Sequence, residues 1–187
     1  MSSILLLNQE ICEPDGTVLV TPSTTAILAA FMPDGTVQDI AVGALASQPG
    51  VLCGTGLALT MVITDGDSSI TSAQIRVIGA DCFDRALDET RETNVAGSAT
   101  YNLAKPFYRI DTLKVTGVNF TGGDLLSIGV TGILGLPVVI SSASEVRVAR
   151  VDGGIEAVPT IVVADNTWEP ASAPNSARRF YVNIFGD

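Results

Sequence analysis

The stretch of sequence that decides the fold is FYRIDTLKVTGVNFTGGDLLSIGV, residues 107–130. In its first half, apolar side chains such as Leu113 and Val115 alternate with polar ones, which is the pattern of a strand with one buried face. The alternation is imperfect, so we expect a bulge or kink in this strand. The polar residues 119–124 then turn the chain, and residues 125–130 return it, which predicts a β-hairpin.

Further strands are predicted upstream of this hairpin. Residues 70–81 carry strand-like apolar spacing and end at Gly-Ala-Asp, and residues 56–64 form an apolar run of strand length. Residues 25–31, TAILAAF, fit either a buried strand or a helical turn, and we favour the strand. Residues 86–93, ALDETRET, alternate charged and neutral side chains, which favours an exposed edge strand over a short helix.

Two copies of Pro-Asp-Gly-Thr-Val punctuate the N-terminal part, at residues 14–18 and 33–37. Pro presets φ, and Asp-Gly accepts the tight positions that follow, so each copy predicts a turn leading into a strand. The polar run at residues 65–69 marks a soft boundary. We therefore expect a β-rich N-terminal segment, residues 1–66, followed by a β-sandwich domain, residues 67–187.

The C-terminal part continues the strand pattern. Residues 145–151 alternate, and Asp-Gly-Gly at 152–154 is a strong hairpin turn. Residues 165–177 read as a polar loop that holds the lone Trp168, and residues 178–185 read as an aromatic-rich strand. The fold class we predict is all-β, an antiparallel β-sandwich or jelly-roll-like domain with a β-rich N-terminal segment.

Composition narrows the classes of partner. The formal net charge is −10, with ten Lys and Arg in total, and this sign repels phosphate backbones, so nucleic acid is not expected as a direct partner. Only 16% of the residues are charged while 47% are apolar. Because so few charges leave little to cover a free monomer, we expect part of the surface to be buried in an assembly.

No membrane span or targeting signal is predicted. Residues 40–64 and 125–144 lack charge, but Gly and Pro interrupt both, which is typical of short strands and turns. The apolar run at residues 4–7 follows no basic residue and is too short for a signal-peptide core. We therefore expect the protein to stay in the compartment where it is made.

The three cysteines, Cys12, Cys53 and Cys82, are widely spaced, and the chain has no His. A zinc site is not expected from such a set. We predict buried free thiols in a reducing compartment, with intermolecular disulfides as the alternative. No cofactor is predicted.

Two glycine- or aspartate-rich patterns suggest ligand binding but have simpler explanations. Asp65 and Asp67 flank one Gly as in a calcium loop, yet no Glu lies at the EF-hand distance, so we predict a solvated turn and leave ion binding open. Gly129, Gly132 and Gly135 match no phosphate-loop spacing, so we interpret them as tight turns between strands. No metal site is predicted.

Asp84, Asp88 and Glu89 form the densest carboxylate group. Paired carboxylates can run glycoside hydrolysis, with Trp168 as a stacking platform for sugar. With one Trp and three Tyr in the chain, we favour a solvated charged strand or turn instead. No catalytic residue is predicted, and we expect the protein not to be an enzyme.

Five motifs follow one another over residues 76–137. They are RVIGAD (76–81), LDET (87–90), AKPFYRIDTL (104–113), DLLSIG (124–129) and LGLP (134–137). In order and spacing they resemble a module of tailed-phage virion structural proteins.

The resemblance implies a β-sandwich-like virion component. Its most specific implication is a capsid cement (decoration) protein that stabilises the shell through contacts with the major capsid protein or other virion subunits. It also implies a homo-oligomer, with a trimer as our guess, and a location in the virion, assembled in the host cytoplasm. The alternative function is a carbohydrate-binding or receptor-contacting domain of the phage head or tail.

Five residues are predicted to contact other subunits. Trp168 fits an interface anchor or a plug over the domain's own core, and the plug is favoured. Arg178 and Arg179 fit an acidic partner. Phe107 and Tyr108 complete the predicted interface.

Overall fold

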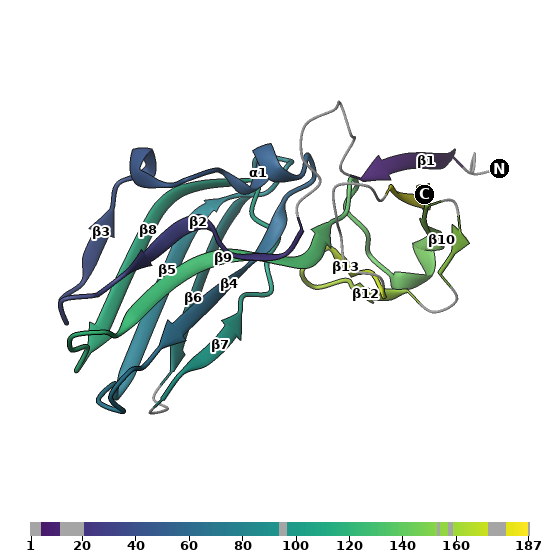
Figure 1. Ribbon diagram of the computed structural model, residues 1–187. Helices are drawn as coiled ribbons and strands as arrows, with labels where there is room; N and C mark the ends of the chain where they lie inside the picture. Colours follow the sequence, from purple (N-terminus) through teal and green to yellow (C-terminus); the bar gives the residue numbers. More distant parts are fainter. Residues whose placement is uncertain are drawn as a thin grey trace.

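The computed structural model describes residues 5–11, 21–93, 97–152, 154–156, 159–171 and 179–186. Strands make up 54% of the protein and helices 7%, so the prediction of an all-β, sandwich-like fold is confirmed. Figure 1 shows a larger sandwich and a smaller lobe that carries the first and last strands. No helix in the described part of the chain has the length and apolar character that crossing a membrane requires.

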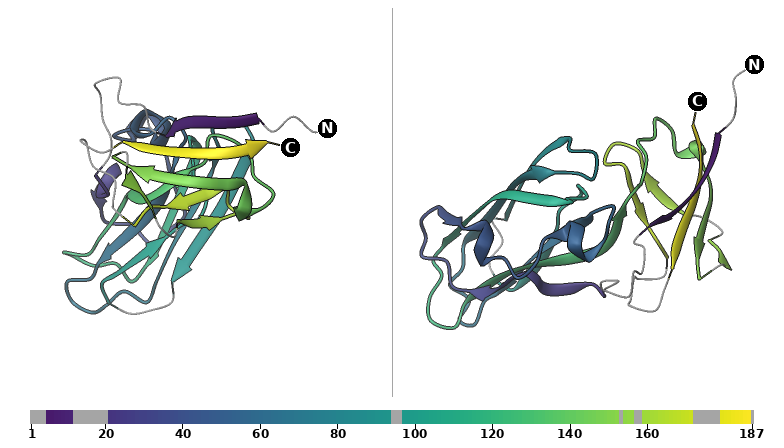
Figure 2. Two further views of the ribbon diagram at one scale, coloured as in Figure 1. Left: turned by 90° about the vertical axis from the view of Figure 1, so that its right-hand side faces the viewer. Right: turned by 90° about the horizontal axis from the view of Figure 1, so that it is seen from above.

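The larger lobe is a sandwich of two antiparallel sheets (Figures 1 and 2). One sheet has the order β3-β8-β5-β6, and the other has the order β7-β4-β9 with β2 also paired to β9. The strands are β2 (Ser23–Phe31), β3 (Gln38–Ile40), β4 (Leu57–Thr64), β5 (Ser72–Ala80), β6 (Ala86–Thr93), β7 (Ala99–Asn102), β8 (Arg109–Val118) and β9 (Leu125–Gly135). A 3-10 helix, η1 (Val42–Ala44), and a single helical turn, α1 (Pro49–Leu52), connect β3 to β4.

The smaller lobe combines both ends of the chain. Its sheet has the order β1-β14-β10-β11, and two short strands, β12 and β13, extend from the end of β9. The bounds are β1 (Leu5–Ile11), β10 (Val146–Val151), β11 (Gly154–Ile155), β12 (Thr160–Val162), β13 (Thr167–Glu169) and β14 (Phe180–Gly186), with the 3-10 helix η2 (Ala143–Glu145) before β10. The expected hairpin at Asp152 is confirmed, because Arg150 pairs with Ile155 and Val151 with Gly154.

The prediction of a polar loop at residues 165–177 is wrong for part of residues 165–171, the part of that range that the structure describes. Residues 167–169 form β13, which pairs with both β12 and β9. The polar flanks hide a three-residue strand, which is too short for a period of two to be recognised.

β9 joins the two lobes and, with 11 residues, is the longest strand in the described part of the chain. Its first part pairs with β4 on one side and β2 on the other, and its last residues pair with β13. Leu134 is the partner of both Leu57 in the sandwich and Trp168 in the smaller lobe. In Figure 2 this strand runs out of the sandwich toward the second lobe.

The glycine series lies within β9, so the interpretation as turns between strands is wrong. A Cβ added at Gly129 would meet the backbone oxygen of Ser23 at 1.7 Å, and one at Gly135 would meet the backbone oxygen of Thr55 at 2.2 Å. Glycine is needed at these positions because another backbone crosses the strand there.

The irregularity expected in residues 107–118 is confirmed as a register shift between β5 and β8. Ile78 pairs with Thr112 but Gly79 pairs with Ile110, so Asp111 is the extra residue. After the shift Leu113 and Val115 are buried, and before it Ile110 is buried while Arg109 and Asp111 are exposed. The bulge thus turns an apolar side chain inward and two charged ones outward.

Two other expectations about strands are confirmed. Residues 25–31 lie in β2, so the strand was the correct choice over the helical turn. Residues 86–93 form β6, which among the described strands pairs only with β5 and lies at the end of its sheet, so the edge strand was correct. The first Pro-Asp-Gly copy lies outside the described residues, whereas in the second Gly35 has φ +83° and the Asp34 carboxylate accepts a hydrogen bond from Thr36 N at 2.9 Å.

The sandwich uses residues on both sides of the boundary expected at residue 66. β4 lies before that point and is hydrogen-bonded along most of its length to β9, which lies well after it. β3, also in the first segment, pairs with β8. The described part of the N-terminal segment therefore supplies strands to both sheets of the sandwich.

One hydrophobic cluster extends from the sandwich into the smaller lobe. Its largest fully buried side chains are Trp168, Phe107, Phe180, Ile27, Leu57, Leu59, Met61, Ile63, Ile70, Ile75 and Leu103. The shared core gives the two lobes a common apolar interior.

The expectation of free thiols holds for Cys82 and is wrong for Cys53. Cys82 is a free, half-buried thiol, and burial raises its pKa above the ordinary value. Cys53 is disulfide-bonded. Cys12 lies outside the described residues. Sequence spacing alone does not indicate which cysteines approach one another in three dimensions.

Gly129 provides a test of the β2–β9 crossing. We expect Gly129→Ala to lower the free energy of unfolding by about 1–3 kcal/mol, because the new methyl group forces the Ser23 backbone away. The matched control is Gly43→Ala, where an added Cβ meets nothing within 4 Å. Urea denaturation of both variants measures the difference, and equal midpoints would show that β2 does not cross β9 closely.

Candidate functional site

The carboxylates singled out in the sequence are engaged by cations of neighbouring strands. Arg76 on β5 donates from Nε to Asp88 Oδ1 at 3.1 Å and from Nη2 to Asp88 Oδ2 at 2.7 Å. Arg109 Nη1 lies 2.9 Å from Asp84 Oδ1. The hydrogen bond from Arg76 holds the pKa of Asp88 below its ordinary value, so this group stays ionised at neutral pH and cannot act there as a general acid.

Glu89 fastens β6 to the loop before β8. Its two carboxylate oxygens accept hydrogen bonds from Ala104 N at 2.8 Å and Lys105 N at 3.0 Å. Both donors are backbone groups, so this carboxylate orders the loop. Asp88 and Glu89 thus have structural roles on the charged edge strand, and Asp84 has one in the turn before it.

Trp168 and Phe107 lie in the core, which corrects their assignment to an interface. Both are 0% exposed. Trp168 packs edge-to-face on Phe180, with ring centroids 5.7 Å apart, and its Nε1 donates to Glu156 Oε2 at 2.9 Å. The core plug is therefore the correct alternative, and a sugar-stacking role for this indole is excluded by its burial.

The other predicted contact residues differ in position. Tyr108 is 40% exposed, and its ring lies against Gly50. Arg179 is exposed and closes the smaller lobe through its backbone, which exchanges hydrogen bonds with Asp152: Arg179 N donates to Asp152 Oδ1 at 2.9 Å, and Asp152 N donates to Arg179 O at 2.8 Å. Arg178 lies outside the described residues.

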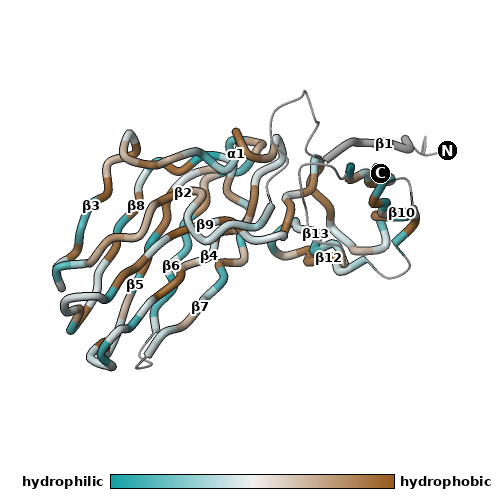
Figure 3. The backbone as a smooth tube through the Cα atoms, viewed as in Figure 1, coloured by the Kyte–Doolittle hydropathy of each residue, from teal (hydrophilic) through white to brown (hydrophobic). Residues whose placement is uncertain are grey.

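A group of exposed apolar side chains follows the β3–α1 edge of the sandwich and is interrupted on β3 by the exposed Asp39. Its members, here called the edge surface, are Val37, Val42, Val51 and Tyr108, which are 63%, 40%, 71% and 40% exposed. Residues 40–52 carry no charge at all. Figure 3 shows hydrophobic stretches along this edge, one of them at α1. The composition predicted that apolar surface would be left over, but it did not indicate where.

Beneath the edge surface, the Gln48 side chain forms hydrogen bonds to the edge of β8 that a neighbouring strand would otherwise form. The Gln48 amide accepts from Ile110 N at 2.7 Å and donates to Ile110 O at 3.3 Å. Gly50 N then donates to Tyr108 O at 2.7 Å. These bonds satisfy Ile110 N, Ile110 O and Tyr108 O beyond the end of β3, while the side chains of Val42 and Val51 are exposed.

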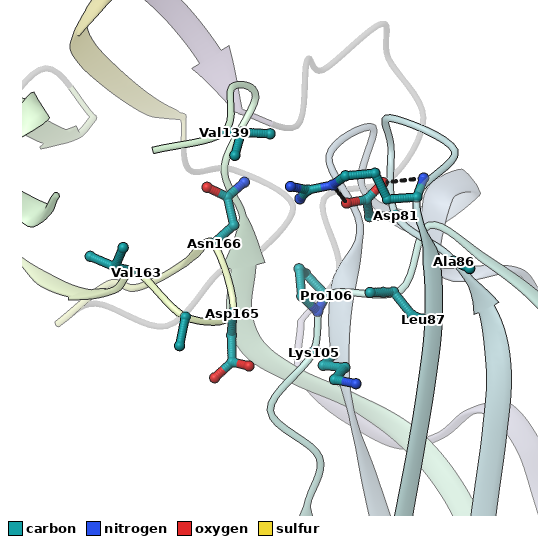
Figure 4. Close-up of a pocket in the computed structure, with 11 residues that line it drawn as sticks. Asp81, Ala86, Leu87, Lys105, Pro106, Val139, Val163, Asp165 and Asn166 are labelled. Atoms are coloured by element: carbon teal, nitrogen blue, oxygen red, sulfur yellow. Dashed lines mark hydrogen bonds and ion pairs between the residues drawn. The ribbon is translucent and has the colours of Figure 1, made fainter. Parts of the chain in front are cut away.

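A cleft of about 260 Å³ lies between the two lobes (Figure 4). Asp81 accepts from Arg85 Nε at 2.6 Å on one wall, and on the other Asn166 Oδ1 accepts from Ile140 N at 3.1 Å. Lys105 Nζ donates to the backbone oxygen of Asp88 at 2.6 Å. Because these polar groups are already paired within the chain, the cleft is better explained as the joint between the lobes than as a ligand site.

Three carboxylates form a cluster at the far end of the sandwich, and the sequence pattern indicated only two of them. Asp65 and Asp67 are joined by Asp124, and one oxygen from each lies within 4.8 Å of the other two. Asp124 is fully buried, and its Oδ1 accepts from Gly66 N at 2.7 Å. The signal for Asp124 is the pairing of Thr64 with Leu125, which places Asp65 beside Asp124, and this pairing cannot be read from one sequence.

Comparisons with protein-family models, with curated proteins and with solved structures each found no match to this chain.

Substitution of Trp168 tests whether its side chain has a core role or an interface role. We expect Trp168→Ala to lower the free energy of unfolding by about 3–5 kcal/mol, because it removes a fully buried indole. Tyr108→Ala, at a side chain that is 40% exposed, should cost much less. Thermal denaturation followed by circular dichroism compares the two. An unchanged Tm for Trp168→Ala would contradict the core position.

Proposed function

We propose that this protein is a structural component of a tailed-phage virion, specifically a capsid cement (decoration) protein that binds the major capsid protein or other virion subunits. The observation that carries the proposal is the edge surface, a group of exposed apolar side chains that includes part of the uncharged segment 40–52 on a chain whose net charge is −10. Exposed apolar patches of this kind mark protein–protein contacts.

The two edges of sheet β3-β8-β5-β6 differ in their exposed side chains, which favours contact with other subunits at one edge and not at the other. At the β6 edge, Asp88, Arg91 and Glu92 are exposed, and such charges discourage pairing with another chain. At the β3–α1 edge, Asp39 is exposed and paired with Lys114, but the exposed side chains of residues 40–46 are all apolar. The contrast favours contact with other subunits through the β3–α1 edge and solvent at the β6 edge.

The motifs that resemble the phage module fall mainly on the sandwich strands. RVIGAD lies on β5 and its end, LDET lies on β6, and DLLSIG begins β9. The disulfide at Cys53 is also in keeping with this location, because disulfides persist on virion surfaces.

The mechanism of such a protein is mechanical. Each apolar Å² removed from water between subunits contributes about 25 cal/mol, and a specific contact buries on the order of 1,200–2,000 Å². Binding to the assembled shell and not to its free subunits stabilises the shell by mass action. The homo-oligomer, with a trimer as our guess, remains a prediction that size-exclusion chromatography with light scattering measures.

The location is tested by mass spectrometry of purified particles. A copy number comparable to that of the major capsid protein is expected for a cement protein. A handful of copies would instead indicate a tail or portal component, and absence from the particles would contradict the virion assignment.

The edge surface is tested with charge substitutions. We expect Val42→Asp/Val51→Asp to weaken binding to particles or self-association by at least about tenfold, ~1.4 kcal/mol, because two carboxylates would be buried in the contact. The monomer should keep its Tm, since both side chains are exposed.

The matched control is Ile155→Asp/Val162→Asp, which changes side chains that are 66% and 40% exposed on the smaller lobe. Co-sedimentation with particles measures both variants. If the edge variant binds as well as wild type, the edge surface is not the contact.

A further inference from the structure

We propose that two copies of this protein pair along the open edge of β1 (Leu5–Ile11), in antiparallel orientation about a two-fold axis. β1 is the end strand of the sheet β1-β14-β10-β11, and among the described strands it pairs only with β14. Figure 2 shows it as the outermost strand of the smaller lobe. Its other edge, unpaired within the described part of the chain, offers backbone N–H and C=O groups to a further strand. This contact does not depend on the proposed function.

The other open edges of the described sheets are protected against such pairing. β6 carries exposed charges at Asp88, Arg91 and Glu92, and β3, β7, β11 and β12 have only two to four residues each. β2 is longer, but two register shifts interrupt its pairing with β9, and Ile27 O accepts a hydrogen bond from Ala46 N at 2.9 Å. Charges, short strands and irregular strands all discourage pairing with another chain.

β1 has none of these protections. It has seven residues, and all seven pair with β14 in one continuous register without a shift. Its sequence, LLLNQEI, contains no Pro and no Lys, and Glu10 is its one charged residue. A long, regular and nearly uncharged open edge is a template for another strand.

The charge of this sheet favours a second copy of the chain as the partner. β11 and β14 carry no charged residue, β10 carries Arg147 and Arg150, and β1 carries Glu10, so two positive charges and one negative charge sum to +1 over the four strands. The whole chain has a net charge of −10. Two such acidic chains repel each other, and the repulsion is small where these sheets meet edge to edge.

One register of the two-fold pair uses all seven residues of β1. It is centred on Asn8, so Asn8 lies opposite the partner's Asn8, and Glu10 lies opposite the partner's Leu6. A pair centred on Glu10 would shorten the overlap and place two carboxylates opposite each other, which is destabilising. The sequence of β1 therefore selects the longest register, which joins two four-stranded sheets into one continuous sheet.

A two-fold contact requires an even number of copies in the assembly. β1 pairing alone gives a dimer, and together with a threefold contact at the edge surface it gives six copies. Because a small contact holds weakly, the full chain is measured at about 100–200 µM by size-exclusion chromatography with light scattering. We expect an even number of copies. A monomer or a trimer at this concentration would overturn the proposal.

Asn8→Lys tests whether β1 forms the contact. In the two-fold register this substitution places two Lys opposite each other, so we expect self-association to weaken by about fivefold. The matched control is Ile155→Lys, which adds the same charge on β11 at the other end of the sheet, at a residue that is 66% exposed. This control should associate as wild type does. Equal weakening in both variants, or none in Asn8→Lys, would contradict the β1 contact.

A mixing experiment separates a lost contact from a misfolded strand. Asn8→Asp should also associate weakly by itself, but an equimolar mixture with Asn8→Lys should associate at least as tightly as wild type, because opposite charges then face each other across the axis. Native mass spectrometry distinguishes the mixed dimer from the two homodimers by mass. Hydrogen exchange should slow at residues 5–11 in the mixture relative to each variant alone. A mixture of monomers, or slower exchange at residues 40–52 in place of 5–11, would overturn the proposal.

Discussion

The pairing of β9 with its neighbours is the constraint on which the rest of the structure depends. A strand of 11 residues must satisfy backbone groups along both edges, and β9 does so with β4 on one side and with β2 and β13 on the other. Glycines at 129 and 135 allow other backbones to approach at distances that a Cβ would forbid. The same strand thus closes the sandwich and begins the smaller lobe, so the core extends through both.

The distribution of charge follows from this arrangement. Sheet β3-β8-β5-β6 has one edge lined with Asp, Glu and Arg. At its other edge β3 carries one exposed carboxylate, Asp39, and the uncharged segment at residues 40–52 follows. At this edge the Gln48 amide replaces a strand and satisfies Ile110, so apolar side chains reach solvent without leaving the backbone unpaired. An edge with a satisfied backbone and exposed valines suits burial against another subunit through side chains.

The β4–β9 pairing has a second consequence at its far end. It places an Asp-Gly-Asp loop beside the loop that ends in Asp124, and it buries a carboxylate oxygen without a donor. This arrangement costs stability through repulsion between like charges, and backbone N–H groups of Gly66, Ser69 and Thr121 that donate to the carboxylates offset part of that cost.

The local sequence pattern by itself determined the strands whose side chains alternate and the charged edge strand at residues 86–93. It also determined the irregularity before Leu113 and the turn at Gly35. Each of these features depends on neighbours within a few residues. Tertiary structure alone decided that three glycines lie in one strand, that Trp168 and Phe107 are core residues, and that Asp124 joins Asp65. Each of these depends on which distant segments pair, and a period of two gives a strand's face without naming its partner.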